Sequence, residues 1–146
     1  MTTDGGVPVV LRRRRLHRVT FLAAAAYNLA WGAATVLDPQ ALFRWAGMEP
    51  LNQPAVFACL GMAIGLYGFV YAEVARRPER GFLLAAVGLA GKTLGPIGWA
   101  VEVARHDWPL RTGVLIVFND LVWWVPFGLY LADAWPWYRR DLRAGG

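Results

Sequence analysis

The stretch FLLAAVGLAGKTLGPIGWAVEV, residues 82–103, decides the fold, because it is long and apolar yet carries Lys92 near its centre. A second stretch, GVLIVFNDLVWWVPFGLYLAD at residues 113–133, carries Asp120. A helix crosses the bilayer core in about 20 residues, so each stretch is long enough to span it. A charge at that depth costs roughly 2.5–3.5 kcal/mol on insertion scales and usually faces a bundle interior. The two stretches therefore predict a membrane bundle with a polar centre.

Two further apolar stretches, residues 19–37 and 55–75, complete a set of four. The chain of 146 residues is 57% hydrophobic and 17% charged, whereas soluble domains hold nearer ~25% charged residues. We expect an all-α fold, a four-transmembrane-helix bundle that forms a single membrane domain over residues 1–146. Short tails are expected at residues 1–18 and 134–146. In the connection 38–54, Pro39, Phe43 and Trp45 favour a short helix that lies in the membrane interface.

The arginines are distributed unevenly between the two sides of this bundle. Eleven belong to the side of both termini and three to the opposite side; the first set is Arg12, Arg13, Arg14, Arg15, Arg18, Arg76, Arg77, Arg80, Arg139, Arg140 and Arg143, and the second is Arg44, Arg105 and Arg111. The positive-inside rule then predicts a multi-pass protein of the bacterial inner (cytoplasmic) membrane with both termini in the cytoplasm. We attribute the net charge of +5 to topology and anionic lipids, and expect membrane lipids as partners and no nucleic acid.

Small residues at helical spacing predict close packing of the helices. Gly61 and Gly65 form a GxxxG pair on the second span, and Gly88, Gly91, Gly95 and Gly98 follow on the third. Small residues let helix backbones approach closely in lipid. The pattern predicts a tight bundle, and the same faces could equally mediate a homo-oligomer.

Polar side chains on three spans are expected to meet at mid-membrane. The backbone levels of Lys92 and Asp120 differ by roughly 6 Å, within side-chain reach. Large rings share the faces of these polar residues, either as walls of a ligand pocket or as an ordinary packed interior. Pro96 and Pro126 would free the carbonyls of the residues four positions earlier. The candidate ligand-binding residues are Asn28, Trp31, Lys92, Trp99, Asn119, Asp120, Trp123 and Trp124.

Several kinds of chemistry have little support in the sequence. Cys59 is the single cysteine, so it cannot form an internal disulfide or a four-thiolate metal site. His17 and His106 fall at segment edges, which argues against haem. Residues 91–93 match part of a relaxed phosphate-binding loop, but they lie mid-membrane with no preceding strand. We expect no cofactor, no metal and no catalytic residue.

The runs AYNLAWG (residues 26–32), GKTLGPIG (residues 91–98) and NDLVWWVPFG (residues 119–128) resemble a group of small, largely uncharacterised bacterial four-helix membrane proteins. The similarity extends from about residue 18 to residue 135 and implies the same fold and site residues. Some members carry the label alkyl hydroperoxide reductase. That chemistry needs a reactive thiolate in a water-accessible site, normally with a resolving cysteine. Cys59 alone does not supply it, so we expect the label not to apply.

Three functions remain open from the sequence. In the first, the protein is not an enzyme, and its polar centre is structural or binds a small hydrophobic ligand or lipid. In the second, it is a proton-coupled transporter of small molecules that works as a homo-oligomer. In the third, it is a membrane enzyme that acts on a lipid or quinone, with Asp120 or Lys92 as acid or base. Water access to these two residues separates the hypotheses, because a transporter admits water from each side in turn and a structural pair from neither.

Overall fold

The computed structural model describes residues 11–144, and within them every regular element is a helix. Three long helices come first: α1 (Arg14–Leu37), α3 (Pro54–Arg76) and α4 (Phe82–Ala104). The short helix α2 (Ala41–Trp45) lies between α1 and α3. The last helical stretch runs through the 3₁₀ turn η1 (Leu110–Thr112), α5 (Gly113–Ile116), the π-helical turn η2 (Val117–Leu121) and α6 (Val122–Ala144). The expected all-α class is confirmed.

Four helical stretches are long and apolar enough to cross a membrane, and they lie where the sequence predicted spans. Their ends differ from the prediction. The first helix begins at Arg14, before the apolar run, and α6 continues past Asp133 to Ala144. An apolar run marks the hydrocarbon core, whereas a helix can continue into the headgroup region where arginines are solvated. Residues 14–18 and 134–144, expected in tails, are therefore helical; residues 1–10 and 145–146 lie outside the described part.

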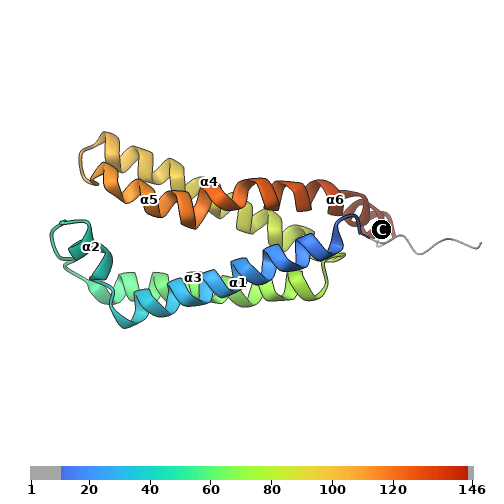
Figure 1. Ribbon diagram of the computed structural model, residues 1–146, viewed down its shortest axis with the longest axis horizontal. Helices are drawn as coiled ribbons and strands as arrows, with labels where there is room; N and C mark the ends of the chain where they lie inside the picture. The colour runs from blue at the N-terminus through green and yellow to red at the C-terminus, as the bar shows by residue number, and fades with distance from the viewer. Residues whose placement is uncertain (1–10, 145–146) are drawn as a thin grey trace, which may run out of the picture.

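The long helices associate as two pairs. Figure 1 shows α1 alongside α3, and α4 alongside α5 and α6. In the first pair the backbones are very close, because a Cβ added to Gly32 would lie 2.6 Å from the Cα of Gly65 and 2.7 Å from the carbonyl oxygen of Gly61. The GxxxG pair of the second span thus packs within the chain. An oligomer could not use this contact without separating α1 from α3.

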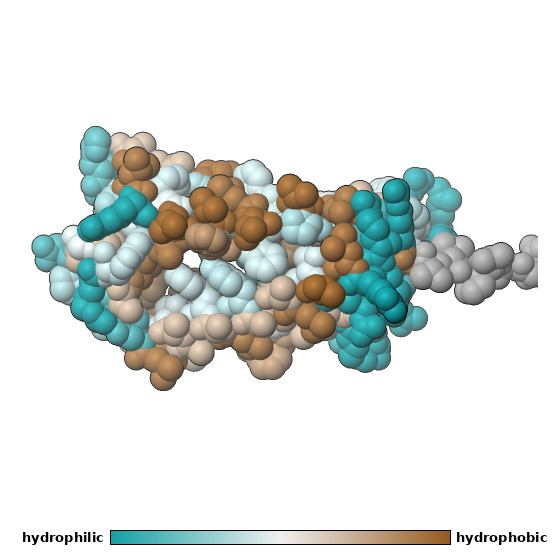
Figure 2. All heavy atoms as spheres, in the orientation of Figure 1, coloured by the Kyte–Doolittle hydropathy of each residue, from teal (hydrophilic) through white to brown (hydrophobic). Residues whose placement is uncertain are grey.

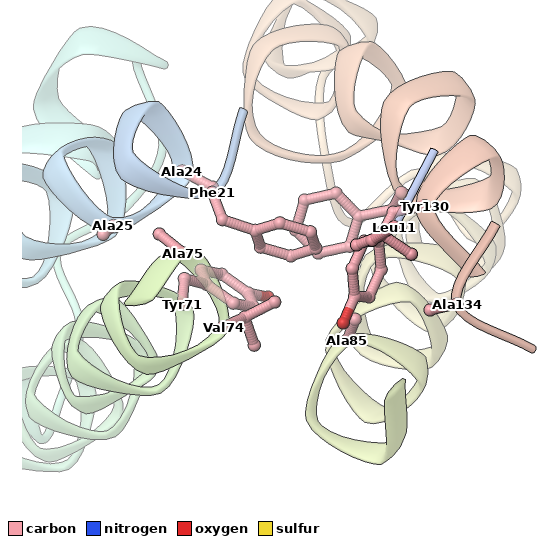
Figure 3. Close-up of a cluster of buried hydrophobic side chains, with 11 residues drawn as sticks. Leu11, Phe21, Ala24, Ala25, Tyr71, Val74, Ala75, Ala85, Tyr130 and Ala134 are labelled. Carbon is pink, nitrogen blue, oxygen red and sulfur yellow. The ribbon is translucent and has the colours of Figure 1, made fainter. Parts of the chain in front are cut away.

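The two pairs meet in an aromatic core near the end of the molecule that carries both termini. We call this the arginine-rich end, because the start of α1, the α3–α4 connection and the end of α6 bring their arginines there. Figure 3 shows Phe21 of α1, Tyr71 of α3 and Tyr130 of α6 directed toward one another. Ring centroids are 4.5 Å apart for Phe21 and Phe127, and 4.8 Å apart for Phe21 and Tyr130. Such ring contacts add about 0.5–1.5 kcal/mol each to their area burial.

Beside this core, a polar cluster joins the first helix to the last. The guanidinium of Arg13 donates two hydrogen bonds of 2.8 Å to the carboxylate of Asp133, and Nε2 of His17 lies 2.8 Å from the same carboxylate. We call Arg13, His17 and Asp133 the terminal clamp. The histidine, expected at a segment edge, is buried. The clamp and the core together close the arginine-rich end of the bundle.

The surface has the polarity of a membrane protein. Figure 2 shows a mainly apolar band between two ends rich in polar residues. Exposed apolar side chains are found on every long helix, among them Leu66, Phe69, Leu94 and Val125. Exposure of so much apolar surface is unfavourable in water and favourable in lipid. The chain is a multi-pass membrane protein.

Candidate functional site

A cavity of about 360 Å³ lies between the two helix pairs, near the middle of the long helices. We call it the polar chamber, because the charged and amide side chains of the buried centre reach it. Its floor toward the arginine-rich end is Tyr71, which also belongs to the aromatic core. The lining residues are Asn28, Leu60, Ile64, Tyr67, Tyr71, Gly88, Gly91, Lys92, Gly95, Asn119 and Asp120. All four polar residues that the sequence placed at mid-membrane are therefore brought together here.

Lys92 is 6% exposed and extends from α4 toward η2. Its ammonium donates a hydrogen bond of 2.6 Å to the backbone carbonyl of Asn119 and lies 5.6 Å from the ring centroid of Trp123. No ion pair within 4.0 Å joins the ammonium to Asp120, although both side chains line the chamber. The ammonium, which the sequence placed within side-chain reach of Asp120, bonds to a backbone carbonyl instead.

The carboxylate of Asp120 lies at the π-helical turn η2. Such turns are rare and often occur at functional sites, because the extra residue per turn changes where side chains point. Nδ2 of Asn119 donates a hydrogen bond of 3.0 Å to Oδ1 of Asp120. The other carboxylate oxygen, Oδ2, packs against α4, where a Cβ added to Gly95 would lie 2.9 Å from it. Glycine at position 95 thus makes room for the acid.

The proline in α4 creates the third contact of this centre. Pro96 has no N–H, so the carbonyl of Lys92 loses its helical donor, as the sequence predicted. The indole Nε1 of Trp124 donates a hydrogen bond of 2.9 Å to that carbonyl. A side chain of α6 therefore replaces the missing backbone bond of α4 and fixes the two helices beside Lys92.

Asn28 contributes from the opposite helix pair. Its Nδ2 donates a hydrogen bond of 3.2 Å to the carbonyl of Ile64, which joins α1 to α3. Its side-chain oxygen, Oδ1, is buried and has no hydrogen-bond partner among the described residues. The residue is 4% exposed and lines the chamber. Burial of an acceptor without a donor costs about 1–3 kcal/mol.

A second cavity, of about 340 Å³, lies nearer α2. We call it the apolar chamber; its main walls are Trp31, Leu42, Trp45, Phe57 and Leu115. At its rim, Arg44 donates to the carboxylate of Asp38, and this hydrogen bond lowers the pKa of Asp38 below its ordinary value. The acid at the rim is therefore ionised and paired at neutral pH, and the interior of the chamber is left to apolar groups.

The remaining ring residues of the predicted site are distributed around these chambers. Trp31 lines the apolar chamber, whereas Trp123 and Trp124 contact Lys92 from behind the polar chamber. Trp99 lies outside both, because its indole donates a hydrogen bond of 2.8 Å to Thr112. The prediction that Trp99 belongs with the polar centre finds no support in this geometry.

The contribution of α3 to the polar chamber was not predicted from the sequence. Leu60, Ile64, Tyr67 and Tyr71 line the polar chamber, at the alternating spacing of three and four residues that marks one helix face. That spacing was visible in the sequence, and two tyrosines on it are a detectable signal. This face of α3 carries no charged side chain, so it lacks the signal by which Lys92 and Asp120 were predicted to belong to the site.

The thiol and possible metal ligands lie apart from the chambers. Cys59 is exposed on α3, which in a membrane span is a lipid-facing position. Within residues 11–144, no group of three or more His, Cys, Asp or Glu side chains is placed to hold a metal ion. Neither chamber brings a thiolate to its wall.

Comparison of the chain with protein-family models, with curated proteins and with solved structures finds no match. The architecture and the geometry of the two chambers are therefore the basis for the functional argument.

Proposed function

We propose that the protein binds a small ligand in the polar chamber, within the membrane. The single observation that carries this proposal is a cavity lined by two charged and two amide side chains, one of which, Asn28, has a buried oxygen without a hydrogen-bond partner among the described residues. A purely structural polar centre would pair this oxygen, since buried polar groups are nearly always hydrogen-bonded. The volume of about 360 Å³ supports the proposal, because small-molecule pockets hold roughly 300–1,000 Å³.

The arginine distribution supports an orientation with the arginine-rich end in the cytoplasm of a bacterial cell, in its inner membrane. The aromatic core then separates the chamber from the cytoplasm. Such one-sided closure also favours a second candidate function, a transporter in one of its two access states. Catalysis has weaker support, because no nucleophile with an adjacent base is found among the chamber residues.

The test is whether the polar chamber admits a small molecule, and α4 offers a matched pair of positions for it. A Cβ added to Gly91 or to Gly98 meets nothing within 4 Å, so either accepts cysteine without a clash. Both glycines are exposed, but Gly91 lines the polar chamber and Gly98 lines neither chamber. Each cysteine is introduced into the Cys59→Ala background and treated in liposomes with methyl methanethiosulfonate. This small neutral reagent travels through water or lipid but reacts only with a hydrated thiolate.

We expect Gly91→Cys to react at least about tenfold faster than Gly98→Cys, because the polar chamber holds water and lipid does not. Equal, slow reaction at both positions would show a closed structural centre and would end the proposal. The transporter hypothesis is tested with charged methanethiosulfonates, which do not cross the membrane and are applied from one side at a time. Reaction of Gly91→Cys from both sides would favour transport, and reaction from one side only would favour a binding protein.

A further inference from the structure

Resting on the proposed function, we propose that the ligand of the polar chamber enters from the lipid bilayer, through a gap between α3 and α4. The ligand is then a neutral molecule dissolved in the membrane. Its polar group reaches Lys92 and Asp120 from the side, while its apolar part stays in contact with lipid. This assigns an entry route and a ligand class to the site.

The helices α3 and α4 are in tight contact near the arginine-rich end and separate beyond it. A Cβ added to Gly81 would lie 2.7 Å from Cγ1 of Val74, and one added to Gly88 would lie 2.6 Å from the hydroxyl oxygen of Tyr71. Further along α4, a Cβ added to Gly91 meets nothing within 4 Å, although this glycine lines the polar chamber. Figure 1 shows α4 diverging from α3 toward the end that carries α2. The contact between the two helices is therefore closed at Gly88 and open at Gly91.

The exposed residues of the polar chamber all belong to these two helices. They are Leu60, Tyr67, Gly91 and Gly95, which we call the lateral rim. Leu60 is 51% exposed, whereas Asn28 of α1 and Asp120 of η2, which line the chamber from the other side, are each 4% exposed. Leu94, beside the rim, is apolar and exposed, as expected for a side chain that contacts lipid. Because α3 and α4 are both candidate membrane spans, the lateral rim opens toward lipid.

The contacts of α1 with its neighbours are covered by comparison. The ring of Tyr27 on α1 packs against Trp123 of α6, with ring centroids 5.9 Å apart, and Trp123 in turn lies beside the ammonium of Lys92. On the other side of α1, the backbones of Gly32 and Gly65 are in contact. Rings or backbone contacts therefore close these two sides, whereas α4 presents glycines at the lateral rim.

The charges of the polar chamber favour a neutral ligand. The formal charges of Lys92 and Asp120 cancel, and a charged ligand would be strongly disfavoured on its way through lipid. Lys92 donates one hydrogen bond, to Asn119, so two of its three N–H groups have no acceptor within residues 11–144. Oδ2 of Asp120 likewise accepts no hydrogen bond from these residues. A neutral, lipid-soluble molecule whose polar group both accepts and donates, such as an alcohol or a phenol, fits this arrangement.

The entry route is tested with a thiol reagent that is confined to lipid, N-dodecylmaleimide. It is applied to Gly91→Cys and Gly98→Cys, each in the Cys59→Ala background and held in liposomes. Both positions are exposed, but only Gly91 belongs to the lateral rim. We expect Gly91→Cys to react at least about tenfold faster than Gly98→Cys, because its thiol is reached from lipid and is also hydrated in the polar chamber.

A matched pair of substitutions on α3 tests the gap itself. Leu60 and Met62 are both 51% exposed, but Leu60 belongs to the lateral rim and Met62 lines an outer groove between α1 and α3. Leu60→Trp should slow the reaction of Gly91→Cys with N-dodecylmaleimide by about tenfold or more, because the indole fills the gap, while Met62→Trp should not change it. Neither should slow a maleimide on a long polyethylene glycol chain, which is neutral and stays in water. Tyr67→Ala should widen the gap and speed the reaction, and it replaces Leu60→Trp if that variant does not fold.

The ligand class is tested by protection of Gly91→Cys from N-dodecylmaleimide. Three competitors share the same hexylphenyl group: para-hexylphenol, hexylbenzene and para-hexylbenzenesulfonate. We expect para-hexylphenol to protect at least about tenfold better than the other two, because hexylbenzene has no hydrogen-bonding group and the sulfonate is charged.

The outcomes separate this inference from the proposed function. Equal reaction of Gly91→Cys and Gly98→Cys with N-dodecylmaleimide would overturn the entry route, as would equal effects of the two tryptophan substitutions. Equal slowing of the water-confined maleimide by Leu60→Trp would overturn it as well. Protection by hexylbenzene or by the sulfonate that matches para-hexylphenol, or no protection by any of the three, would overturn the ligand class. A thiol at position 91 that reacts with methyl methanethiosulfonate no faster than one at position 98 would instead reject the proposed function itself.

Discussion

Removal of the indole N–H of Trp124 should destabilise the protein only while Pro96 is present. In Trp124→Phe, the carbonyl of Lys92 loses the donor that lies 2.9 Å away and has no backbone substitute. Hydrogen bonds between membrane helices are worth about 0.6 kcal/mol on average and about 1.7 kcal/mol at most. In Pro96→Ala, the new N–H at position 96 can bond this carbonyl as in a regular helix. We therefore expect a coupling energy of about 1 kcal/mol between the two substitutions.

The assay is reversible unfolding in mixed detergent micelles, followed by far-ultraviolet circular dichroism, for the two single variants and the double variant. The loss of ring volume in Trp124→Phe occurs in both backgrounds and cancels in the cycle. Pro136→Ala, which alters the same helix as Trp124 but three turns further on, is the control background and should show no coupling. If Trp124→Phe costs the same free energy with proline or alanine at position 96, the indole does not replace the missing backbone bond.

Four further outcomes are expected. Asn28→Leu removes both an unpaired buried acceptor and the hydrogen bond to Ile64, so it should stabilise the purified, ligand-free protein by at most about 1 kcal/mol in the same unfolding assay; a loss of more than about 2 kcal/mol would show that this oxygen is paired. Gly95→Ala should destabilise by about 1–3 kcal/mol, since its Cβ would lie 2.9 Å from Oδ2 of Asp120, whereas Gly98→Ala, with open space, should be neutral or stabilising by up to about 1 kcal/mol. Cys59→Ala should leave folding intact and change no peroxidase activity measured on pure protein, because the thiol is exposed to lipid and has no second cysteine to resolve it. A cysteine placed in the N-terminal tail should resist impermeant reagents applied to intact cells, and labelling from outside would contradict the cytoplasmic orientation.

The spans were predictable because about 20 apolar residues in a row have few alternatives to a membrane helix. The ends of the helices were harder to predict, because hydropathy indicates contact with lipid and carries no information on backbone hydrogen bonding. The first helix begins at Arg14, and α6 includes arginines that the apolar pattern placed in a tail. The short helix between the first two spans was expected from its apolar and aromatic residues, and it is present as α2.

The residues of the polar centre could be predicted, but the hydrogen bonds that they form could not. Lys92, Asp120, Asn119 and Asn28 do line one cavity, as depth along regular helices indicated. The depth argument assumed a regular α-helix around Asp120, whereas η2 is π-helical and offers the carbonyl of Asn119 to the lysine. The apolar chamber could not be predicted, because it depends on how far apart the two helix pairs lie. Periodicity within one helix carries no information on that separation.

The terminal clamp has a consequence for how the chain is made. Arg13 lies 120 positions before Asp133, so at synthesis rates of about 5–20 residues per second the two leave the ribosome roughly 6–24 s apart. During that interval the nascent protein holds an arginine and a histidine without their acid. A product terminated before Asp133 would lack the carboxylate that Arg13 and His17 contact, so the terminal clamp could not form. The terminal clamp between the first helix and the last can therefore form only after Asp133 has been synthesised.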